Sequence, residues 1–187
     1  PKGSKEFDLE CLAEGKFSKA SVCKPVKCGE CPDPNSHDDY QNALLVPVAP
    51  RTYGQQCQYT CEKGYTLDTT PEGPNALSST CTATGEYTSP VSCKPVSCGP
   101  PPQVTHADVS AKDKDDPISY SNKVGYKCDK GYTLTGLAGD DKQFDLTCRY
   151  KGIFTVAPEC QPVLCGAPPV VKFAKYSATP RTFNETV

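Results

Sequence analysis

Short runs of alternating apolar and polar residues recur along this chain of 187 residues. Residues 124–128 alternate apolar or cystine-forming side chains with small or polar ones, and residues 57–61 repeat this pattern with Cys57 in place of Val124. Residues 144–148 alternate in the same way. A period of two is that of a half-buried β-strand. Because no stretch keeps a helical period, the pattern predicts an all-β protein of short strands.

A tetrapeptide with the sequence Gly-Tyr-Thr-Leu occurs twice, at residues 64–67 and 131–134. In each copy a turn glycine precedes a short run that is rich in strand-forming residues. The 19 prolines and 14 glycines supply many further turns. The chain is therefore expected to fold as compact, turn-rich β modules.

The 13 cysteines follow nearly constant intervals. Cys11, Cys81 and Cys148 are each followed by a cysteine 12 residues on and by another 5 residues later. Two complete units start at Cys28 and Cys98, and such regularity indicates a tandem repeat. We expect four segments: the C-terminal half of a module, a complete module with extra cysteines, a second complete module, and the N-terminal part of another, at residues 1–27, 28–97, 98–164 and 165–187.

The outer segments match only parts of this unit. Residues 7–11 align with residues 144–148, and residues 180–183 align with residues 50–53. The alignment predicts that the chain begins and ends within modules.

The composition agrees with small disulfide-stapled modules. Only 36% of the residues are apolar, and Trp and Met are absent. Domains this small rarely have a sufficient core and add disulfides, which persist in oxidising compartments. We therefore expect an extracellular, secreted or cell-surface protein. A net charge of −2 gives no basic footprint for nucleic acid, and no run is long and apolar enough for a membrane span.

The complete units resemble sushi domains, also called complement control protein modules or short consensus repeats. The motif Tyr-x-Cys-x-x-Gly-Tyr-x-Leu occupies residues 126–134 and 59–67. A Gly-x-aromatic triplet follows at residues 152–154 and 85–87, and residues 158–160 read Pro-x-Cys. The resemblance covers the whole chain and implies small, short-stranded β-sandwich modules in tandem. At about 35 Å for each module, the array is expected to form an elongated rod.

One departure from the family is systematic. Its usual tryptophan, six residues after the third cysteine, is replaced by another aromatic residue in each unit: Phe17, Tyr87 and Phe154. A planar ring can still cap the small core, so the fold is expected to persist. The replacement argues for a branch distinct from vertebrate complement proteins.

The family joins the first cysteine to the third and the second to the fourth. Carried over, this connectivity implies four bridges: Cys28–Cys81, Cys61–Cys93, Cys98–Cys148 and Cys128–Cys160. Without the resemblance, four cysteines allow three connectivities. Closing a loop of about 50 residues is worth roughly 4 kcal/mol in the chain-entropy model.

Five cysteines lie outside this scheme. Cys31 and Cys57 occur together in one unit, which favours an added disulfide; a four-thiolate zinc site that also uses the cysteines at 28 and 61 is the alternative. Cys11, Cys23 and Cys165 are expected to pair with cysteines outside this chain.

Other candidate chemistry is sparse. The acidic run at 113–116 and the pair Asp140 and Asp141 lack the alternating oxygen ligands, glycine and terminal glutamate of an EF-hand, which favours solvated loops over calcium binding. His37 and His106 have no catalytic motif beside them. We expect no catalytic residue, no metal site and no cofactor, and therefore no enzyme.

Asn184 begins an Asn-Glu-Thr glycosylation sequon, which we expect to be used. The linkers at residues 24–27, 94–97 and 161–164 share the form x-Pro-Val-x. Proline restricts the backbone, whereas a flexible tether would be longer and richer in Gly and Ser. Successive modules are therefore expected to meet with similar geometry.

Two functions are compatible with these features. The first is a structural component of a longer surface or filamentous assembly, with neighbouring modules or other chains as protein partners. The alternative is an adhesion or complement-regulator-like segment that recognises a ligand through variable loops. Residues 35–48 and 105–117 vary between units, and the apolar residues 44–47 could face another chain or pack under their own loop.

Overall fold

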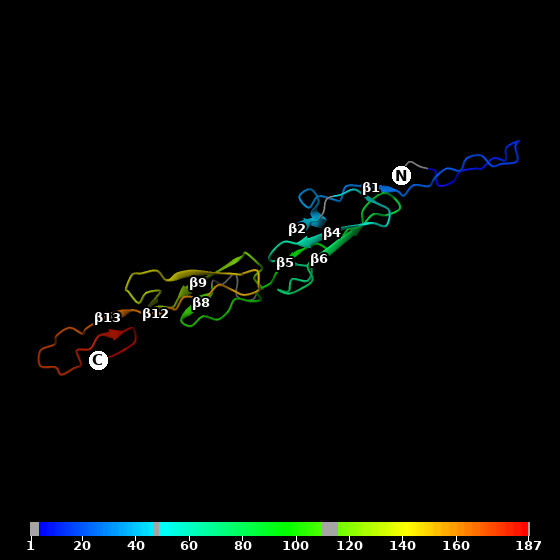
Figure 1. The fold of residues 1–187 in the computed structure, drawn as a ribbon. Helices are drawn as coiled ribbons and strands as arrows, with labels where there is room; N and C mark the ends of the chain where they lie inside the picture. Colours follow the sequence, from blue (N-terminus) through cyan, green and yellow to red (C-terminus); the bar gives the residue numbers. More distant parts are fainter. Residues whose placement is uncertain (1–3, 47–48, 110–115, 187) are drawn as a thin grey trace. The chain divides into compact units, whose positions relative to one another are not determined.

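The computed structural model describes residues 4–46, 49–109 and 116–186, and these are built from short antiparallel strands (Figure 1). They divide into two compact units, Pro1–Glu62 with Pro74–Lys94 and Lys63–Gly73 with Pro95–Val187. Apart from one three-residue 3-10 turn, the regular elements in the described residues are strands. The all-β prediction is confirmed.

The first unit contains a three-stranded sheet in the order β2-β4-β6 and a two-stranded sheet of β1 and β3. The elements in chain order are β1 (Lys27–Gly29), the 3-10 turn η1 (Asp38–Tyr40), β2 (Ala43–Leu45), β3 (Arg51–Thr52), β4 (Gln56–Cys61) and β6 (Ala76–Thr80).

Strand β4 has the alternation that its sequence predicts, because Cys57, Tyr59 and Cys61 are buried while the residues between them are exposed. The ring of Tyr40 lies 4.8 Å from that of Tyr59, measured between centroids. Its hydroxyl donates a hydrogen bond of 2.9 Å to the fully buried Ser79 hydroxyl. The core of the first unit therefore includes a ring from the η1 turn and a satisfied polar pair.

The second unit has a three-stranded sheet in the order β8-β9-β11, with smaller pairs β10-β12 and β13-β14. Its strands are β5 (Tyr65–Thr66), β8 (Ala107–Val109), β9 (Lys123–Cys128), β10 (Tyr132–Thr133), β11 (Gln143–Thr147), β12 (Gln161–Pro162), β13 (Leu164–Gly166) and β14 (Arg181–Thr182). Strand β7 (Lys94–Pro95), at the division between the units, pairs with β5.

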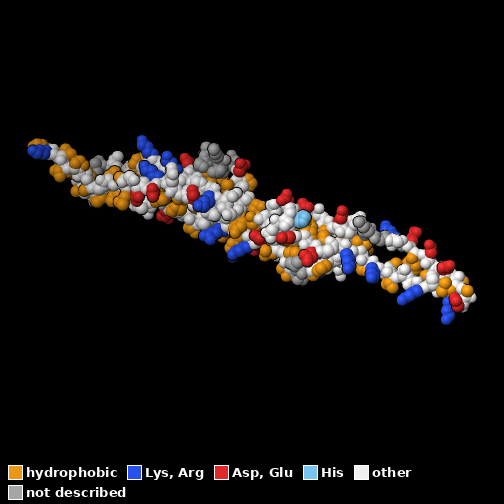
Figure 2. All heavy atoms as spheres, turned by 90° about the horizontal axis from the view of Figure 1, so that it is seen from above, with side chains coloured by type: hydrophobic (Ala, Val, Ile, Leu, Met, Phe, Trp, Pro, Cys, Tyr) orange, Lys and Arg blue, Asp and Glu red, His pale blue; other side chains and the backbone are white. Residues whose placement is uncertain are grey.

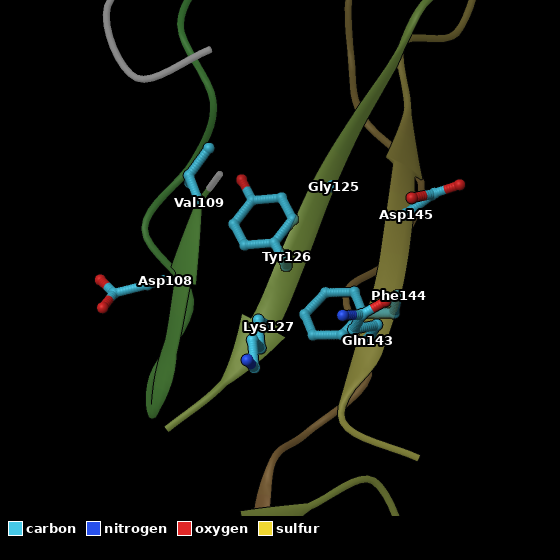
Figure 3. A pocket seen from close by; sticks show the side chains of 8 residues that line it. All are labelled: Asp108, Val109, Gly125, Tyr126, Lys127, Gln143, Phe144 and Asp145. Carbon is cyan, nitrogen blue, oxygen red and sulfur yellow. The ribbon is translucent and has the colours of Figure 1, made fainter. Parts of the chain in front are cut away.

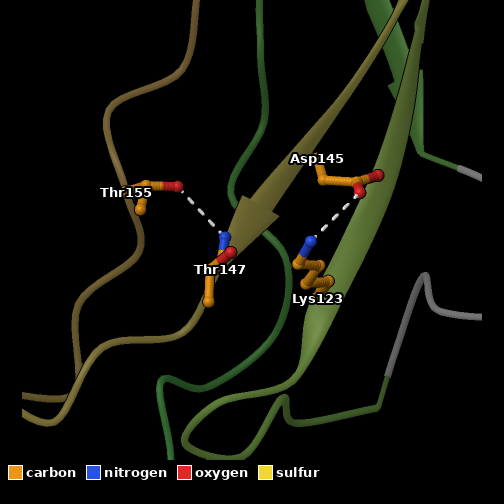
Figure 4. Close-up of polar contacts among 4 residues, drawn as sticks. All are labelled: Lys123, Asp145, Thr147 and Thr155. Atoms are coloured by element: carbon orange, nitrogen blue, oxygen red, sulfur yellow. Dashed lines mark hydrogen bonds and ion pairs between the residues drawn. The ribbon is translucent and has the colours of Figure 1, made fainter.

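The core of the second unit lies against β9 and β11. It consists of five buried side chains: Ile118, Val124, Tyr126, Leu146 and Cys148. The antiparallel register places Leu146 opposite Val124 and Phe144 opposite Tyr126, so apolar side chains share one face of the sheet. The end of β11 is also tied by a hydrogen bond of 3.0 Å from the Thr147 N–H to the Thr155 hydroxyl, drawn with a nearby surface ion pair in Figure 4.

Some of the proposed variable loops lie outside the described residues. This holds for residues 47–48 and 110–115, which include most of the acidic run at 113–116. In the remaining part of the apolar stretch, Leu44 and Val46 are exposed, and Leu45 is half-buried.

Candidate functional site

Five disulfides staple the described chain. Each unit has one bridge of long sequence separation, 53 residues for Cys28–Cys81 and 50 residues for Cys98–Cys148. Each also has a bridge that spans 32 residues, Cys61–Cys93 or Cys128–Cys160. The family-derived prediction named these same four pairs.

The fifth bridge joins Cys31 to Cys57 and spans 26 residues. Both sulfurs are buried, and Cys28 and Cys61 are bonded elsewhere. In this structure none of the four is a thiolate that could bind zinc. No group of three or more metal-binding side chains occurs within residues 4–46, 49–109 and 116–186.

Three cysteines form no disulfide within the described residues. Cys11, Cys23 and Cys165 are all exposed. Their pairing with cysteines outside this chain stays a prediction.

Two of the three linker valines form hydrogen bonds through both their N–H and their carbonyl. In the linker at 94–97, the Val96 N–H donates to the Gly64 carbonyl at 2.8 Å, and the Val96 carbonyl accepts from the Tyr120 N–H at 2.7 Å. Val96 is only 1% exposed. This linker is therefore an ordered part of the second unit and not a flexible tether.

The linker at 161–164 repeats these bonds. The Val163 N–H donates to the Gly131 carbonyl at 2.8 Å, and the Phe183 N–H donates to the Val163 carbonyl at 2.9 Å. In the first unit, the Tyr53 N–H donates to the Val26 carbonyl at 2.8 Å. Each x-Pro-Val-x linker thus presents a valine carbonyl to the N–H of an aromatic residue.

Sequence reasoning missed these aromatic residues as a set. The alignment of residues 180–183 with residues 50–53 already placed Phe183 opposite Tyr53, and the repeat places Tyr120 there too. An aromatic residue at all three positions was the available signal. It was missed because the valine that each aromatic residue contacts lies 20 to 27 residues before it along the chain, outside any local pattern.

A groove of about 360 Å³ lies on the three-stranded sheet of the second unit (Figure 3). Tyr126 and Phe144 line it, with parallel rings whose centroids are 5.2 Å apart. The Tyr126 hydroxyl donates a hydrogen bond of 2.7 Å to the Pro102 carbonyl, and burial raises the pKa of this hydroxyl. Asp108, Lys127 and Asp145 also line the groove, so charged side chains of both signs border it.

Comparison with known proteins assigns these modules to a family. The family model described as Sushi repeat (SCR repeat) matches residues 28–93 and 98–160. The chain belongs to the sushi family. This confirms the family resemblance that its cysteine and glycine motifs indicated.

Several known proteins contain a similar stretch of sushi repeats. The mouse "Sushi, von Willebrand factor type A, EGF and pentraxin domain-containing protein 1" is 35% identical over 186 residues, which cover 98% of this chain and 5% of the relative. Mouse Pappalysin-1 is 29% identical over 89% of this chain and 10% of its own length. Dog E-selectin is 29% identical over 84% of this chain and 24% of its own length. The chain therefore spans a small part of each relative.

Sushi repeats occur in extracellular and cell-surface proteins and mediate protein interactions. No helix among the described residues of this sushi chain has the length and apolar character needed to cross a membrane.

The aromatic residues at the tryptophan position of the sushi motif share one backbone contact. Phe17, Tyr87 and Phe154 each form an isolated antiparallel bridge with the third cysteine of their unit. Phe154 packs against the core of the second unit, and the Tyr87 hydroxyl donates to the Gly29 carbonyl at 2.8 Å. Phe17 is 69% exposed.

The titratable residues considered from the sequence have local structural contacts. The His37 ring lies edge-on to Tyr40, and the His106 ring stacks on Tyr132 with 4.1 Å between centroids. Hydrogen bonds from the Thr135 hydroxyl and the Asp141 N–H hold the pKa of Asp140 below its usual value. The Asp140 carboxylate therefore stabilises the loop that contains it, through hydrogen bonds to nearby residues.

Charges of both signs are interspersed on the face that Figure 2 shows. In the described part of the chain, Lys123 and Asp145 form an ion pair with 3.9 Å between nitrogen and oxygen, and both side chains are more than half exposed. An exposed pair of this kind contributes little to stability.

Proposed function

We propose that this chain is a non-enzymatic, extracellular segment of a longer sushi array, in which regular linkage of modules is the structural role. The observation that carries the proposal is the repeated pair of hydrogen bonds around Val96 and Val163. A linker in which the N–H and the carbonyl of the residue after the proline are both hydrogen-bonded has little freedom to rotate.

The disulfides support an extracellular location for the array. Five bridges in a segment of this size suit an oxidising compartment, and chain-entropy closure of the loops of 50 and 53 residues contributes about 4 kcal/mol each. We propose residues 28–97 and 98–164 as its complete modules, flanked by partial modules at residues 1–27 and 165–187.

Electron microscopy and small-angle scattering of the natural assembly test this structural role. A periodic polymer or surface layer that contains the chain at a regular spacing is the expected result. A monodisperse monomer that captures one soluble protein would contradict it.

Recognition of another protein is a second candidate function, and the groove beside Tyr126 and Phe144 favours it. Gly125 leaves space in this surface, because an added Cβ would meet only the Asp145 carboxylate at 3.7 Å. The first module has Gln58 at the corresponding place. If the groove binds a protein, Gly125→Gln should abolish capture of that protein, whereas Gly139→Ala, whose added Cβ meets nothing within 4 Å, should preserve it.

We also propose that Asn184 carries an N-linked glycan. It is exposed, and it follows Phe183 in a turn with a positive φ of 70°. Intact mass before and after glycosidase treatment of the secreted protein tests this. An unchanged mass, equal to that of the Asn184→Gln variant after correction for the substitution, would show that the site is unused.

A further inference from the structure

The hydrogen-bonded linkers are accompanied by a second contact, in which an aromatic ring covers a glycine. Gly64 has a φ of +91°, and a Cβ built on it would lie 2.2 Å from Cε1 of Tyr120. Gly131 has a φ of +85°, and its Cβ would lie 2.3 Å from Cδ1 of Phe183. Both positions therefore need glycine for two reasons, the left-handed backbone and the ring that occupies the side-chain space.

The tyrosine after each glycine completes the contact. The rings of Tyr65 and Tyr120 meet edge to face with centroids 5.8 Å apart, and those of Tyr132 and Phe183 do so at 6.0 Å. Edge-to-face packing is a favoured arrangement of aromatic pairs. In both cases a Gly-Tyr turn that precedes the linker along the chain contacts one aromatic ring that follows the linker, and both contacts lie in the second unit.

The contact around Val96 has additional components. The Ser97 N–H donates to the Thr69 carbonyl at 2.8 Å. A Cβ on Gly152 would lie 2.3 Å from Cγ of Pro71, so these two residues also touch. The Lys63 ammonium lies 4.0 Å from the ring centroid of Tyr150. These contacts join residues 63–71, around the Gly64 turn, to Ser97 and to residues 150–152.

We propose that the Gly-Tyr turn is a socket through which one sushi module recognises the next, with Tyr120 or Phe183 as the inserted ring. The partner is a second sushi module that supplies an aromatic residue whose N–H bonds to the linker valine. This deepens the proposed structural role, on which it rests, by assigning the residues that fix each linkage. Glycine, tyrosine and the inserted ring are positioning residues for the valine hydrogen bonds.

Tyr53 provides a matched control within the same chain. It occupies the corresponding repeat position and makes the corresponding bond to Val26, yet its side chain is 59% exposed. Its ring therefore has no comparable cover among the described residues. Removal of the Tyr53 ring should therefore change the linker contacts little, whereas removal of the Tyr120 ring should leave the space over Gly64 unfilled.

Amide hydrogen exchange of the full chain, with its native disulfides, tests the socket. Tyr120→Ala should accelerate exchange of the Val96 amide and of the amide at position 120 by about tenfold. This factor corresponds to the upper end of the free energy that an aromatic pair contributes. Tyr120→Phe should keep the protection, since phenylalanine serves at 183. Tyr53→Ala should leave the Val96 amide unchanged, and β9 amides should stay protected in all variants.

A second pair of variants addresses the glycine. Gly64→Ala should expose the Val96 amide and remove the upfield ring-current shift expected for the Hα protons of residue 64. Gly139→Ala introduces an alanine at a similar positive φ, +86°, with no neighbouring atom within 4 Å, and should do neither. Equal Val96 protection in wild type, Tyr120→Ala and Gly64→Ala would overturn the socket. A monomeric recognition protein with an intact socket would instead overturn the structural role alone.

Discussion

The two three-stranded sheets share one strand arrangement but fill their cores differently. In β8-β9-β11 the inward positions hold Val124 and Leu146, and both are fully buried. The corresponding positions in β2-β4-β6 hold Cys57 and Ser79. A bridge to Cys31 and the ring of Tyr40, hydrogen-bonded to Ser79, replace the missing aliphatic volume. Apolar packing in one module thus corresponds to a covalent bond and a satisfied polar pair in the other.

The difference shows that side chains of different chemical character can fill the same core positions of a sushi module. A buried hydroxyl is tolerated in the first sheet because it has hydrogen-bond partners, whereas an unpaired one would cost free energy. The shared requirement is a filled space behind the central strand. The following experiments alter that filling in one module at a time.

The long bridge of the second complete module should have the largest effect. The double substitution Cys98→Ala and Cys148→Ala removes a bridge with a separation of 50 residues, and it should lower the free energy of unfolding of residues 98–164 by about 4 kcal/mol. Urea unfolding with hydrogen exchange in β9 measures this. The double substitution Cys31→Ala and Cys57→Ala is the control and should leave β9 protected; equal loss of β9 protection in both would contradict independent modules.

Leu146→Ala should lower the free energy of unfolding of the second sheet by about 3 kcal/mol, because it leaves a cavity behind β9. Ser79→Ala, at the corresponding place in the first sheet, should cost only about 1 kcal/mol through the lost hydrogen bond with Tyr40. Exchange of β9 and β4 amides reports the two effects separately. Similar losses would contradict the expectation that the Ser79 hydroxyl contributes less than the Leu146 side chain.

Alkaline pH should destabilise both sheets. Burial is the main cause of the raised pKa of Tyr59, and it also raises the pKa of Tyr126. Because the unfolded tyrosines lose their protons near pH 10 and the folded ones above it, this stability is complete below about pH 10 and is lost as the pH rises, by up to about 1.4 kcal/mol per unit for each tyrosine.

Urea unfolding between pH 9 and 11 measures this loss in each module. Tyr59→Phe should flatten the pH dependence of the β4 amides, and Tyr126→Phe that of the β9 amides. A dependence that persists unchanged in both variants would exclude these hydroxyls as its cause.

The smallest expected effects concern the contacts in Figure 4. Thr155→Val removes the hydrogen bond from the Thr147 N–H and should cost about 1 kcal/mol. Thr88→Val removes the corresponding bond of the first sheet, from the Thr80 N–H, and should cost the same. Lys123→Ala is the control, since its exposed ion pair contributes less than about 0.5 kcal/mol. A larger loss for Lys123→Ala would contradict this ranking.

Local pattern was sufficient for the strands. Alternation placed strands over residues 57–61 and 124–128, and it correctly gave Cys57 and Val124 the same inward position. The glycine before Tyr65 was correctly expected in a turn, and the structure gives it a positive φ. These features depend on neighbouring residues, so sequence alone contains the necessary information.

Long-range contacts could not be obtained in this way. Nothing in the residues around Tyr40 indicates that its ring reaches Tyr59 and Ser79, because that depends on how the η1 turn lies over the sheet. The groove beside Phe144 depends likewise on three strands at once. The linkers lie between these cases: their proline and valine predicted order, but the bonding partners of Val96 required the folded structure.

The two hydrogen bonds of Val96, repeated at Val163, also bear on the changes in length that the chain can accept. Adding or deleting one residue beside Val96 would turn its N–H and carbonyl away from both partners, since successive residues of an extended segment point to opposite sides. The loops at the ends of strands can absorb such changes. Variation in the length of this protein should therefore collect within loops, or come as whole repeats, and spare the four residues between modules.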